Sequence, residues 1–312
     1  FYEAFHGKGV LYDLLPCTAV YLVLTVIGLF GNTAIVVATI KNQQLHGTCN
    51  TLLAIEALGD ILHQLSHYYL GYLMFSGTVF TEFKTCVYVN VVPLIGVNTA
   101  LFIILFIAID RMFSVIFPLR HRLLNKKLYI SFYLLITIGY CAFILVMIFN
   151  KLQQAPEVKT TCLIIDTMPD EIGQIWFIVY FVVNACTIIC YIAMWLILKY
   201  KSNTSESTNR MFKSLAMITL MVFLGWAVNP CIQMALRTFH ATPITIWYTG
   251  FHAGIPVNVA SSCNYFVLYV FRQDFKIITH FLMNGGFSTD YRLAFKQQFS
   301  TLVKSFCKRN YF

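Results

Sequence analysis

Two pairs of ionisable side chains lie four residues apart, a spacing that brings two side chains together on one face of a helix. Glu56 and Asp60 are four residues apart, so both carboxyl groups would share one face of a helix and resist being ionised together. His63 and His67 have the i, i+4 spacing of a metal-binding pair. Because no third ligand is identifiable, we interpret these histidines as a polar or interfacial pair and predict no metal centre there.

A third pair is formed by neighbours in the stretch AIDRMFSVIFPL, where Asp110 and Arg111 end a long apolar run. Charged side chains are costly in lipid, and an acid next to a base lowers the cost of burying both at the membrane edge. We therefore expect Asp110 and Arg111 to hold each other at the end of a membrane-spanning helix.

The elements that must position these groups are helices in lipid. The chain is 58% hydrophobic and 11% charged, whereas about a quarter of the residues of a soluble protein are charged. Seven apolar runs have roughly the length that crosses a bilayer: 17–40, 51–75, 87–109, 128–149, 172–198, 214–236 and 244–271. Barrel strands are shorter and alternate, so the predicted fold is all-α, a seven-transmembrane helix bundle.

The basic residues predict the orientation. Most of the 22 Lys and Arg flank one side of the membrane, which the positive-inside rule makes the cytosol. We expect residues 1–16 to be extracellular, 17–271 to form the seven-transmembrane domain, and 272–312 to be a cytosolic tail with amphipathic membrane-surface helices. The net charge of +9 then faces the anionic lipid bilayer, and no nucleic-acid partner is expected.

Several short motifs follow one another in a specific order. They are Gly31-Asn32, LAIEALGD ending in Asp60, Cys86 and Arg111 at the ends of the third run, DRMFSVIFPL, Cys162 in the second outer loop, and NYFVLYVFRQDF at the end of the seventh run. Together they resemble the rhodopsin-like (class A) G-protein-coupled receptors. LHGTCNTLLAIEALGDILHQLSHYY, PLIGVNTALFIILFIAIDRMFSVIFP and SSCNYFVLY are most similar to the nematode serpentine chemoreceptors of class SX.

The resemblance implies a disulfide and a polar network. Cys86 and Cys162 would be bonded, tying the second outer loop to the third helix. The network would consist of Asn32, Glu56, Asp60, Ser261 and Asn264. In the family, the position of Asp60 helps to bind a sodium ion or a proton. A purely structural network remains an equal alternative, and no other cofactor is expected.

The resemblance also implies a switch at the cytosolic side. The residues that it assigns to G-protein coupling are Asp110, Arg111, Pro118, Leu119, Tyr191, Asn264 and Tyr269. Where family members carry an acid on helix six that restrains the arginine, this chain has Arg210 and Lys213. We therefore expect no ionic lock between helices three and six, and raised basal activity.

The family's ligand pocket would lie among the outer halves of helices three, five, six and seven. The candidates there are Asn90, Asn98, Tyr180, Asn184, Trp226, Gln233, Arg237, Trp247, His252 and Asn258. Pro93 replaces the Asp of amine receptors and Asn258 replaces the retinal Lys of opsins, so neither ligand is expected. Arg237 and His252 indicate an acidic or amide ligand. Trp226 is either the toggle of the family or a core residue.

Three functions compete. The favoured one is a plasma-membrane, multi-pass receptor that senses a small molecule or peptide and catalyses nucleotide exchange on a heterotrimeric G protein. The alternative is an ion- or proton-coupled transporter or channel that uses Glu56 and Asp60, but transporters often show repeats, and none is visible. A membrane enzyme built on His63 and His67 is the least favoured, and we predict that the protein is not an enzyme.

Overall fold

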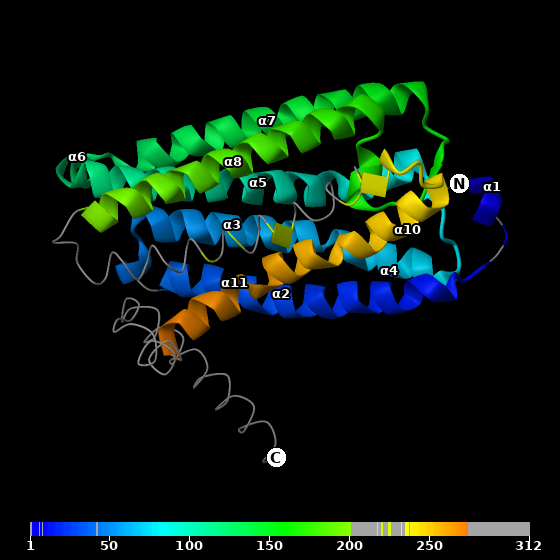
Figure 1. Ribbon diagram of the computed structural model, residues 1–312, viewed down its shortest axis with the longest axis horizontal. Coiled ribbons are helices and arrows are strands. Elements are labelled where there is room, and N and C mark those ends of the chain that lie inside the picture. Colours follow the sequence, from blue (N-terminus) through cyan, green and yellow to red (C-terminus); the bar gives the residue numbers. More distant parts are fainter. Residues whose placement is uncertain are drawn as a thin grey trace, which may run out of the picture.

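The computed structural model describes residues 2–5, 7, 9–41, 43–200 and 238–273, together with seven single positions between 217 and 236. Of residues 268–273 it describes the helix and not the side chains. Long helices lie side by side along the long axis of the molecule (Figure 1). The described part is therefore a helix bundle, and the predicted tail from 274 onward and most of the run 214–236 lie outside the described residues.

The elements follow in the order α1 Tyr2–Phe5, η1 Tyr12–Leu14, α2 Leu15–Lys41, η2 Gln43–Leu45, α3 Thr48–Gln64, α4 Ser66–Ser76, β1 Thr81–Glu82, α5 Phe83–Ile116, α6 Pro118–Leu123, α7 Lys126–Gln154, β2 Lys159–Thr160, η3 Ile164–Thr167, α8 Asp170–Tyr200, α10 Pro243–Ala253 and α11 Ile255–Gln273. β1 and β2, which are far apart in the sequence, pair antiparallel in a two-stranded sheet.

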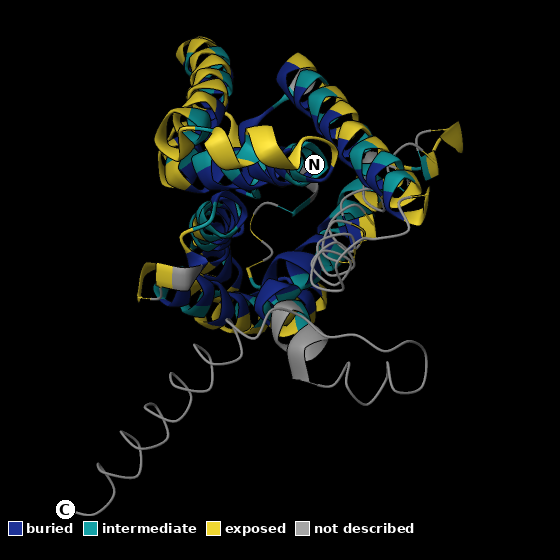
Figure 2. Cartoon of the chain, turned by 90° about the vertical axis from the view of Figure 1, so that its left-hand side faces the viewer, coloured by how far each residue is buried: buried dark blue, intermediate teal, exposed yellow. Residues whose placement is uncertain are grey.

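Four helical segments in the described part are long and apolar enough to cross a membrane. They are Tyr12–Lys41, Phe83–Ile116, Lys126–Gln154 and Glu171–Tyr200. Large apolar side chains are exposed along the outward faces of these helices, and buried residues gather in the interior of the bundle (Figure 2). Such an apolar outer surface suits contact with lipid. Lipid tails are as apolar as these side chains, so the hydrophobic effect does not drive the side chains into the bundle. The predictions for these four runs agree with the helices observed.

The second run was predicted as one helix, and this is wrong in detail. It is divided at Leu65 into α3 and α4. The hydroxyl of Ser66 donates to the carbonyl oxygen of His63 at 2.9 Å, and the Leu65 N–H reaches only three residues back, to Leu62 O at 3.3 Å. Such local bonds compete with the regular i to i−4 ladder and tighten the turn.

The seventh run is also divided, at Gly254 between α10 and α11. Pro256 has no N–H to continue the ladder, and the Gly254 N–H bonds the His252 carbonyl instead. From α2, the hydroxyl of Tyr21 donates to the carbonyl oxygen of Phe251 at 2.6 Å. A side chain at Gly254 would collide with the Tyr21 hydroxyl, so a glycine is required at this close approach.

The backbones of α3 and α5 touch through two glycines. A Cβ atom on Gly59 would lie 2.8 Å from Gly96 O, and one on Gly96 would lie 2.6 Å from Gly59 O. Small residues allow membrane helices to pack this closely. Since α5 also packs against α7 and α8, it is the central helix of the described bundle and carries the acid–base pair at one end.

Candidate functional site

Asp110 and Arg111 lie where α5 approaches the short helix α6. The Asp110 side chain is fully buried, and its Oδ2 accepts a hydrogen bond of 2.9 Å from Arg111 Nε and a second one from an Arg111 terminal nitrogen. The other carboxylate oxygen, Oδ1, accepts from His121 Nε2 at 2.9 Å. The expected acid–base pair is therefore present as part of a triad, and the sequence analysis missed His121.

Of the other predicted coupling residues, three lie near this triad, and Asn264 belongs instead to the polar network described below. Pro118 is the first residue of α6, where its missing N–H costs nothing, and Leu119 is 76% exposed. Tyr191 of α8 is buried in the core cluster that packs around this end of α5 and lies close to Arg111. Tyr269 is within α11, but its side chain is outside the described residues.

The predicted polar network comes together in the middle of the bundle. Asn264 of α11 donates from its Nδ2 to Glu56 Oε1 and to Asp60 Oδ2, both at 2.8 Å. Ser261 borders one small cavity together with Glu56 and Asp60, and Asn32 Nδ2 donates to the carbonyl oxygen of Ser261 at 3.1 Å. All five residues are buried. Two buried carboxyl groups that share one amide donor resist being ionised together.

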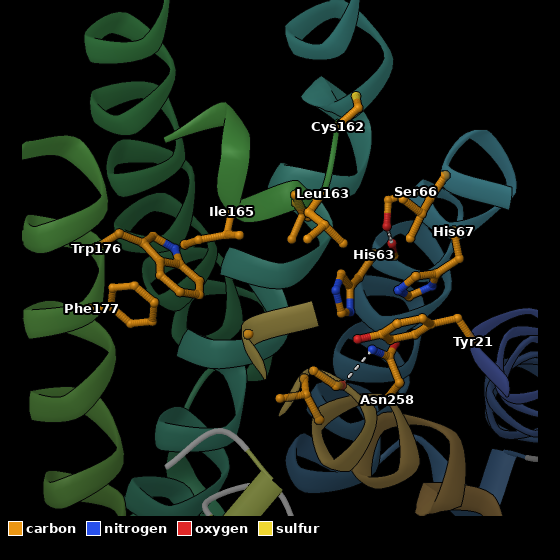
Figure 3. Close-up of a pocket in the computed structure, with 15 residues that line it drawn as sticks. Tyr21, His63, Ser66, His67, Cys162, Leu163, Ile165, Trp176, Phe177 and Asn258 are labelled. Atoms are coloured by element: carbon orange, nitrogen blue, oxygen red, sulfur yellow. Dashed lines mark hydrogen bonds between the residues drawn. The ribbon is translucent and has the colours of Figure 1, made fainter. Parts of the chain in front are cut away.

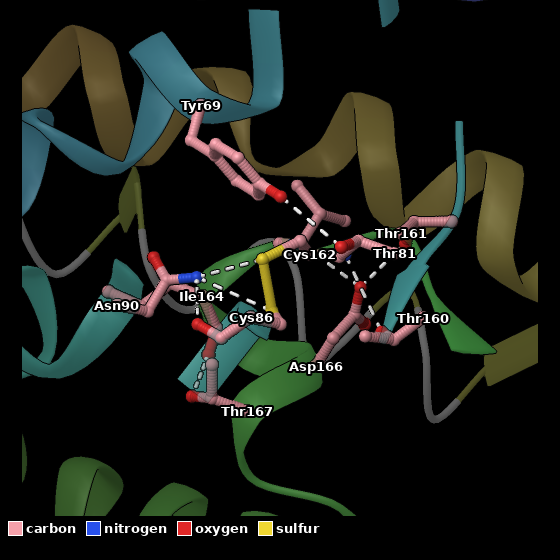
Figure 4. Close-up of a disulfide and its surroundings, with 11 residues drawn as sticks. Tyr69, Thr81, Cys86, Asn90, Thr160, Thr161, Cys162, Ile164, Asp166 and Thr167 are labelled. Atoms are coloured by element: carbon pink, nitrogen blue, oxygen red, sulfur yellow. Dashed lines mark hydrogen bonds between the residues drawn. A yellow bond between two sulfur atoms is a disulfide. The ribbon is translucent and has the colours of Figure 1, made fainter. Parts of the chain in front are cut away.

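The loops at the β1–β2 end are held by the predicted disulfide, Cys86–Cys162, which is confirmed (Figure 4). Cys162 has a φ of 62°, a left-handed conformation that is uncommon outside glycine. Asn90 donates to the Cys162 sulfur at 3.2 Å, so this predicted ligand residue lies against the disulfide. The loop after Cys162 enters the bundle and continues into η3.

Asp166 fixes the turn of η3. Its carboxylate accepts from the Thr161 hydroxyl at 2.6 Å and from the Leu163 backbone N–H at 3.0 Å. Burial raises the pKa of Asp166 above its ordinary value, against the opposing effect of these hydrogen bonds. The bonds place the residues between Cys162 and Asp166 over the end of the bundle.

A pocket opens beneath this loop (Figure 3). One wall comes from α2 and the α3–α4 break and carries polar side chains: Tyr21, His63, Ser66 and His67. The opposite wall comes from η3 and α8, where Ile165, Trp176 and Phe177 are apolar or aromatic (Figure 3). Figure 3 shows Asn258 of α11 below these walls and Leu163 of the loop above them.

The pocket is displaced from the site expected on helices three, five, six and seven. Of the ligand candidates within the described residues, Asn258 lines it. Asn98 is instead bonded to Trp176 Nε1 at 2.8 Å and orients that side chain. Asn184 donates to the Tyr180 carbonyl oxygen at 2.9 Å. Trp226, Gln233 and Arg237 lie outside the described residues.

Two further candidates lie away from the pocket. Trp247 is partly buried against the aromatic cluster around Phe251, and His252 is exposed, with Nδ1 2.8 Å from the Tyr248 carbonyl oxygen. Tyr180 borders a smaller cavity that Glu56 and Asp60 also line. The histidines, which we interpreted as a polar or interfacial pair, are buried and line the pocket.

His63 lies between the pocket and the polar network. It lines the larger pocket and also the smaller cavity of Glu56 and Asp60. Its ring is edge-on to that of His67, with ring centroids 5.7 Å apart. Glu56, Asp60, His63 and His67 follow one another along one face of the broken helix, so a single buried column joins the two cavities.

Comparison with known proteins extends the resemblance. The family model described as serpentine type 7TM GPCR chemoreceptor Srsx matches residues 25–283. The somatostatin receptor type 2 of Sus scrofa is 24% identical over 284 residues, which cover 84% of this chain and 76% of that protein. The somatostatin receptor type 2 of Mus musculus is 24% identical over 278 residues, covering 82% of this chain and 73% of that protein.

Proposed function

Since this chain belongs to the serpentine 7TM GPCR chemoreceptor family Srsx, we propose that it is a plasma-membrane receptor for an extracellular small molecule or peptide. Family membership confirms the resemblance drawn from the motifs and makes the chain a multi-pass membrane receptor of the G-protein-coupled class, not an enzyme. The proposal adds the seven spans, the orientation with the N-terminus outside, and the mechanism.

The orientation is supported by the positions of the disulfide and of the triad formed by Asp110, Arg111 and His121. Cys86–Cys162 lies at the end of α5 that would face the oxidising exterior. Arg111 and His121 lie at the opposite end, near Arg120 and Arg122, which the positive-inside rule assigns to the cytosol. The pocket is then extracellular and the triad cytosolic.

The observation that carries the proposed mechanism is that Asp110 holds Arg111 from within the bundle. The carboxylate is fully buried, so Arg111 is its charge partner as long as the helices stay closed. When a ligand favours the open arrangement, Arg111 leaves Asp110 and contacts the G protein in the cleft. Leu119, exposed on α6, offers an apolar contact beside it.

We also propose that the polar network holds a sodium ion or a proton. The donor set fits a hard monovalent cation: two carboxylates and the hydroxyl oxygen of Ser261 border one small cavity. Asn32 Oδ1 nearby is buried without a hydrogen-bond partner among the described residues. A bound cation would balance one of the two negative charges of Glu56 and Asp60 and favour the closed arrangement, in which Asn264 bridges them.

The test is nucleotide exchange on a panel of heterotrimeric G proteins by the purified receptor in lipid nanodiscs. We expect measurable basal exchange, its loss in Arg111→Ala, and its reduction by sodium relative to potassium. Glu56→Gln with Asp60→Asn should abolish the sodium effect. The matched control is Glu82→Gln, which alters an exposed carboxylate at the far end of the bundle.

The opposite outcome favours the transporter alternative. The buried column from Glu56 to His67 is the observation that supports it, because ionisable groups in series could pass protons. Absence of exchange with every G protein, together with proton or sodium flux in liposomes that Asp60→Asn abolishes, would overturn the receptor mechanism.

A further inference from the structure

We infer that the pocket beneath the second outer loop takes an uncharged, amphiphilic small molecule, with its hydrogen-bonding end toward His63 and its apolar body against α8. This inference rests on the proposed receptor function and names the ligand class of the same site. The observation behind it is that a polar wall and an apolar wall face each other across one pocket (Figure 3).

The polar wall is held in place before any ligand arrives. The rings of Tyr21 and His67 stack with centroids 5.1 Å apart and an angle of 10°. Thr25 Oγ1 lies 3.1 Å from His67 Nδ1, and the Tyr21 hydroxyl is bonded to the Phe251 carbonyl oxygen. Because these rings are already fixed, little side-chain entropy is lost when a polar group binds beside His63.

Asn258 completes this wall from α11. Its Nδ2 donates to the Gly254 carbonyl oxygen at 3.0 Å, and a carboxamide also has an oxygen that can accept a hydrogen bond. An imidazole offers one donor and one acceptor when neutral. The polar wall as a whole therefore suits a ligand group that both donates and accepts, such as an alcohol or a primary amide.

The apolar wall is rigid as well. Trp176 is 2% exposed, and its indole N–H is used by Asn98 Oδ1 at 2.8 Å. The ring is thus available to a ligand as an apolar surface. Phe177 lies beside it, and Leu163 and Ile165 descend from the loop. An aliphatic or aromatic body would be enclosed between α8 and the loop.

The absence of charge decides the class. No Asp, Glu, Lys or Arg lines this pocket among the described residues. An ammonium head would meet no counter-ion there, and burying an unpaired charge is costly. A carboxylate head beside His63 would lie near Glu56 and Asp60, because His63 also lines their smaller cavity. The like charges would repel each other. A neutral head group avoids both penalties.

The test uses matched triplets that differ only in the head group. The probes are octan-1-ol, octanoate and octylammonium, and 3-phenylpropan-1-ol, 3-phenylpropanoate and 3-phenylpropylammonium. Binding is measured as the rise in the thermal unfolding midpoint of the full receptor in nanodiscs at pH 7.4. We expect each alcohol to raise the midpoint, and each charged analogue to need at least a tenfold higher concentration for the same rise.

Two variants separate the pocket from general effects on the bilayer. Ile165→Trp fills the pocket from the loop and should abolish the shift caused by the alcohols. His63→Leu removes the polar contact and should weaken binding of the alcohols about tenfold. His46→Leu is the matched control, because this histidine is exposed between α2 and α3 and does not line the pocket.

The inference is overturned if a charged analogue acts at equal or lower concentration than its alcohol. It is also overturned if no alcohol shifts the midpoint, or if the shifts persist in Ile165→Trp. Nucleotide exchange without probes, measured on the same samples, tests the receptor function separately. Binding of alcohols without any exchange would refute that function and leave the ligand class standing.

Discussion

Asp110 of α5 and His121 of α6 are joined by a hydrogen bond of 2.9 Å between the carboxylate Oδ1 and the imidazole Nε2. The carboxylate that holds Arg111 is therefore also tied to the short helix that presents Leu119. Release of Arg111 and movement of α6 become linked, because both depend on the same buried acid.

Asp110→Asn should raise basal nucleotide exchange. The amide has no charge to hold Arg111. Removing one member of a buried ion pair costs about 3–5 kcal/mol, so the closed arrangement should be destabilised by about this amount relative to the open one. The measurement is exchange without ligand at equal surface expression. Asp13→Asn, which alters an exposed acid in η1, just before α2, is the control and should leave the rate unchanged.

His121→Ala should raise basal exchange by a smaller factor. A hydrogen bond to a charged group is worth about 1.5–3 kcal/mol, and Arg111 still holds Asp110 in this variant. The same assay measures the effect. His46→Ala removes an exposed histidine from the preceding predicted cytosolic loop. Equal rates in the two histidine variants would show that the bond to Asp110 does not restrain the receptor.

Gly96→Ala should destabilise the bundle. Its Cβ would meet Gly59 O and the His63 backbone nitrogen, both at 2.6 Å, and backbone atoms cannot turn aside. Overpacking costs about 1–3 kcal/mol or more, so we expect a lower unfolding midpoint and reduced surface expression. Gly139→Ala has open space around its Cβ and should be neutral or slightly stabilising. Equal behaviour of both variants would contradict the close contact of α3 and α5.

Asp166 should make the outer loop less stable as the pH rises. Burial raises the pKa of this carboxyl in the folded protein, so the folded state binds its proton more tightly than the unfolded chain does. Stability is highest below the ordinary Asp pKa and falls as the pH rises through the raised one. The unfolding midpoint of Asp166→Asn, compared with that of the native receptor from pH 4 upward, should lack this fall. If the unfolding midpoints of the two proteins changed in parallel with pH, the titration of Asp166 would not be the cause of the fall.

Much of the fold followed from local properties of the sequence. Hydropathy and length located the helices α2, α5, α7 and α8, because lipid selects for apolar side chains residue by residue. Helix breaks were not predicted, since they depend on bonds such as Ser66 to His63 and on the approach of Tyr21 to Gly254. Periodicity gives the face of a helix but not which neighbour that face meets.

For the candidate site, the sequence alone determined the pairing of Asp110 with Arg111 and the common face of Glu56 and Asp60, since both depend on residues close along one helix. Only the tertiary structure joined Asn258 to the histidines, Asn98 to Trp176, and His121 to Asp110. These contacts depend on how helices rotate and where loops return. Packing across the whole bundle fixes both, and no short stretch of sequence encodes them.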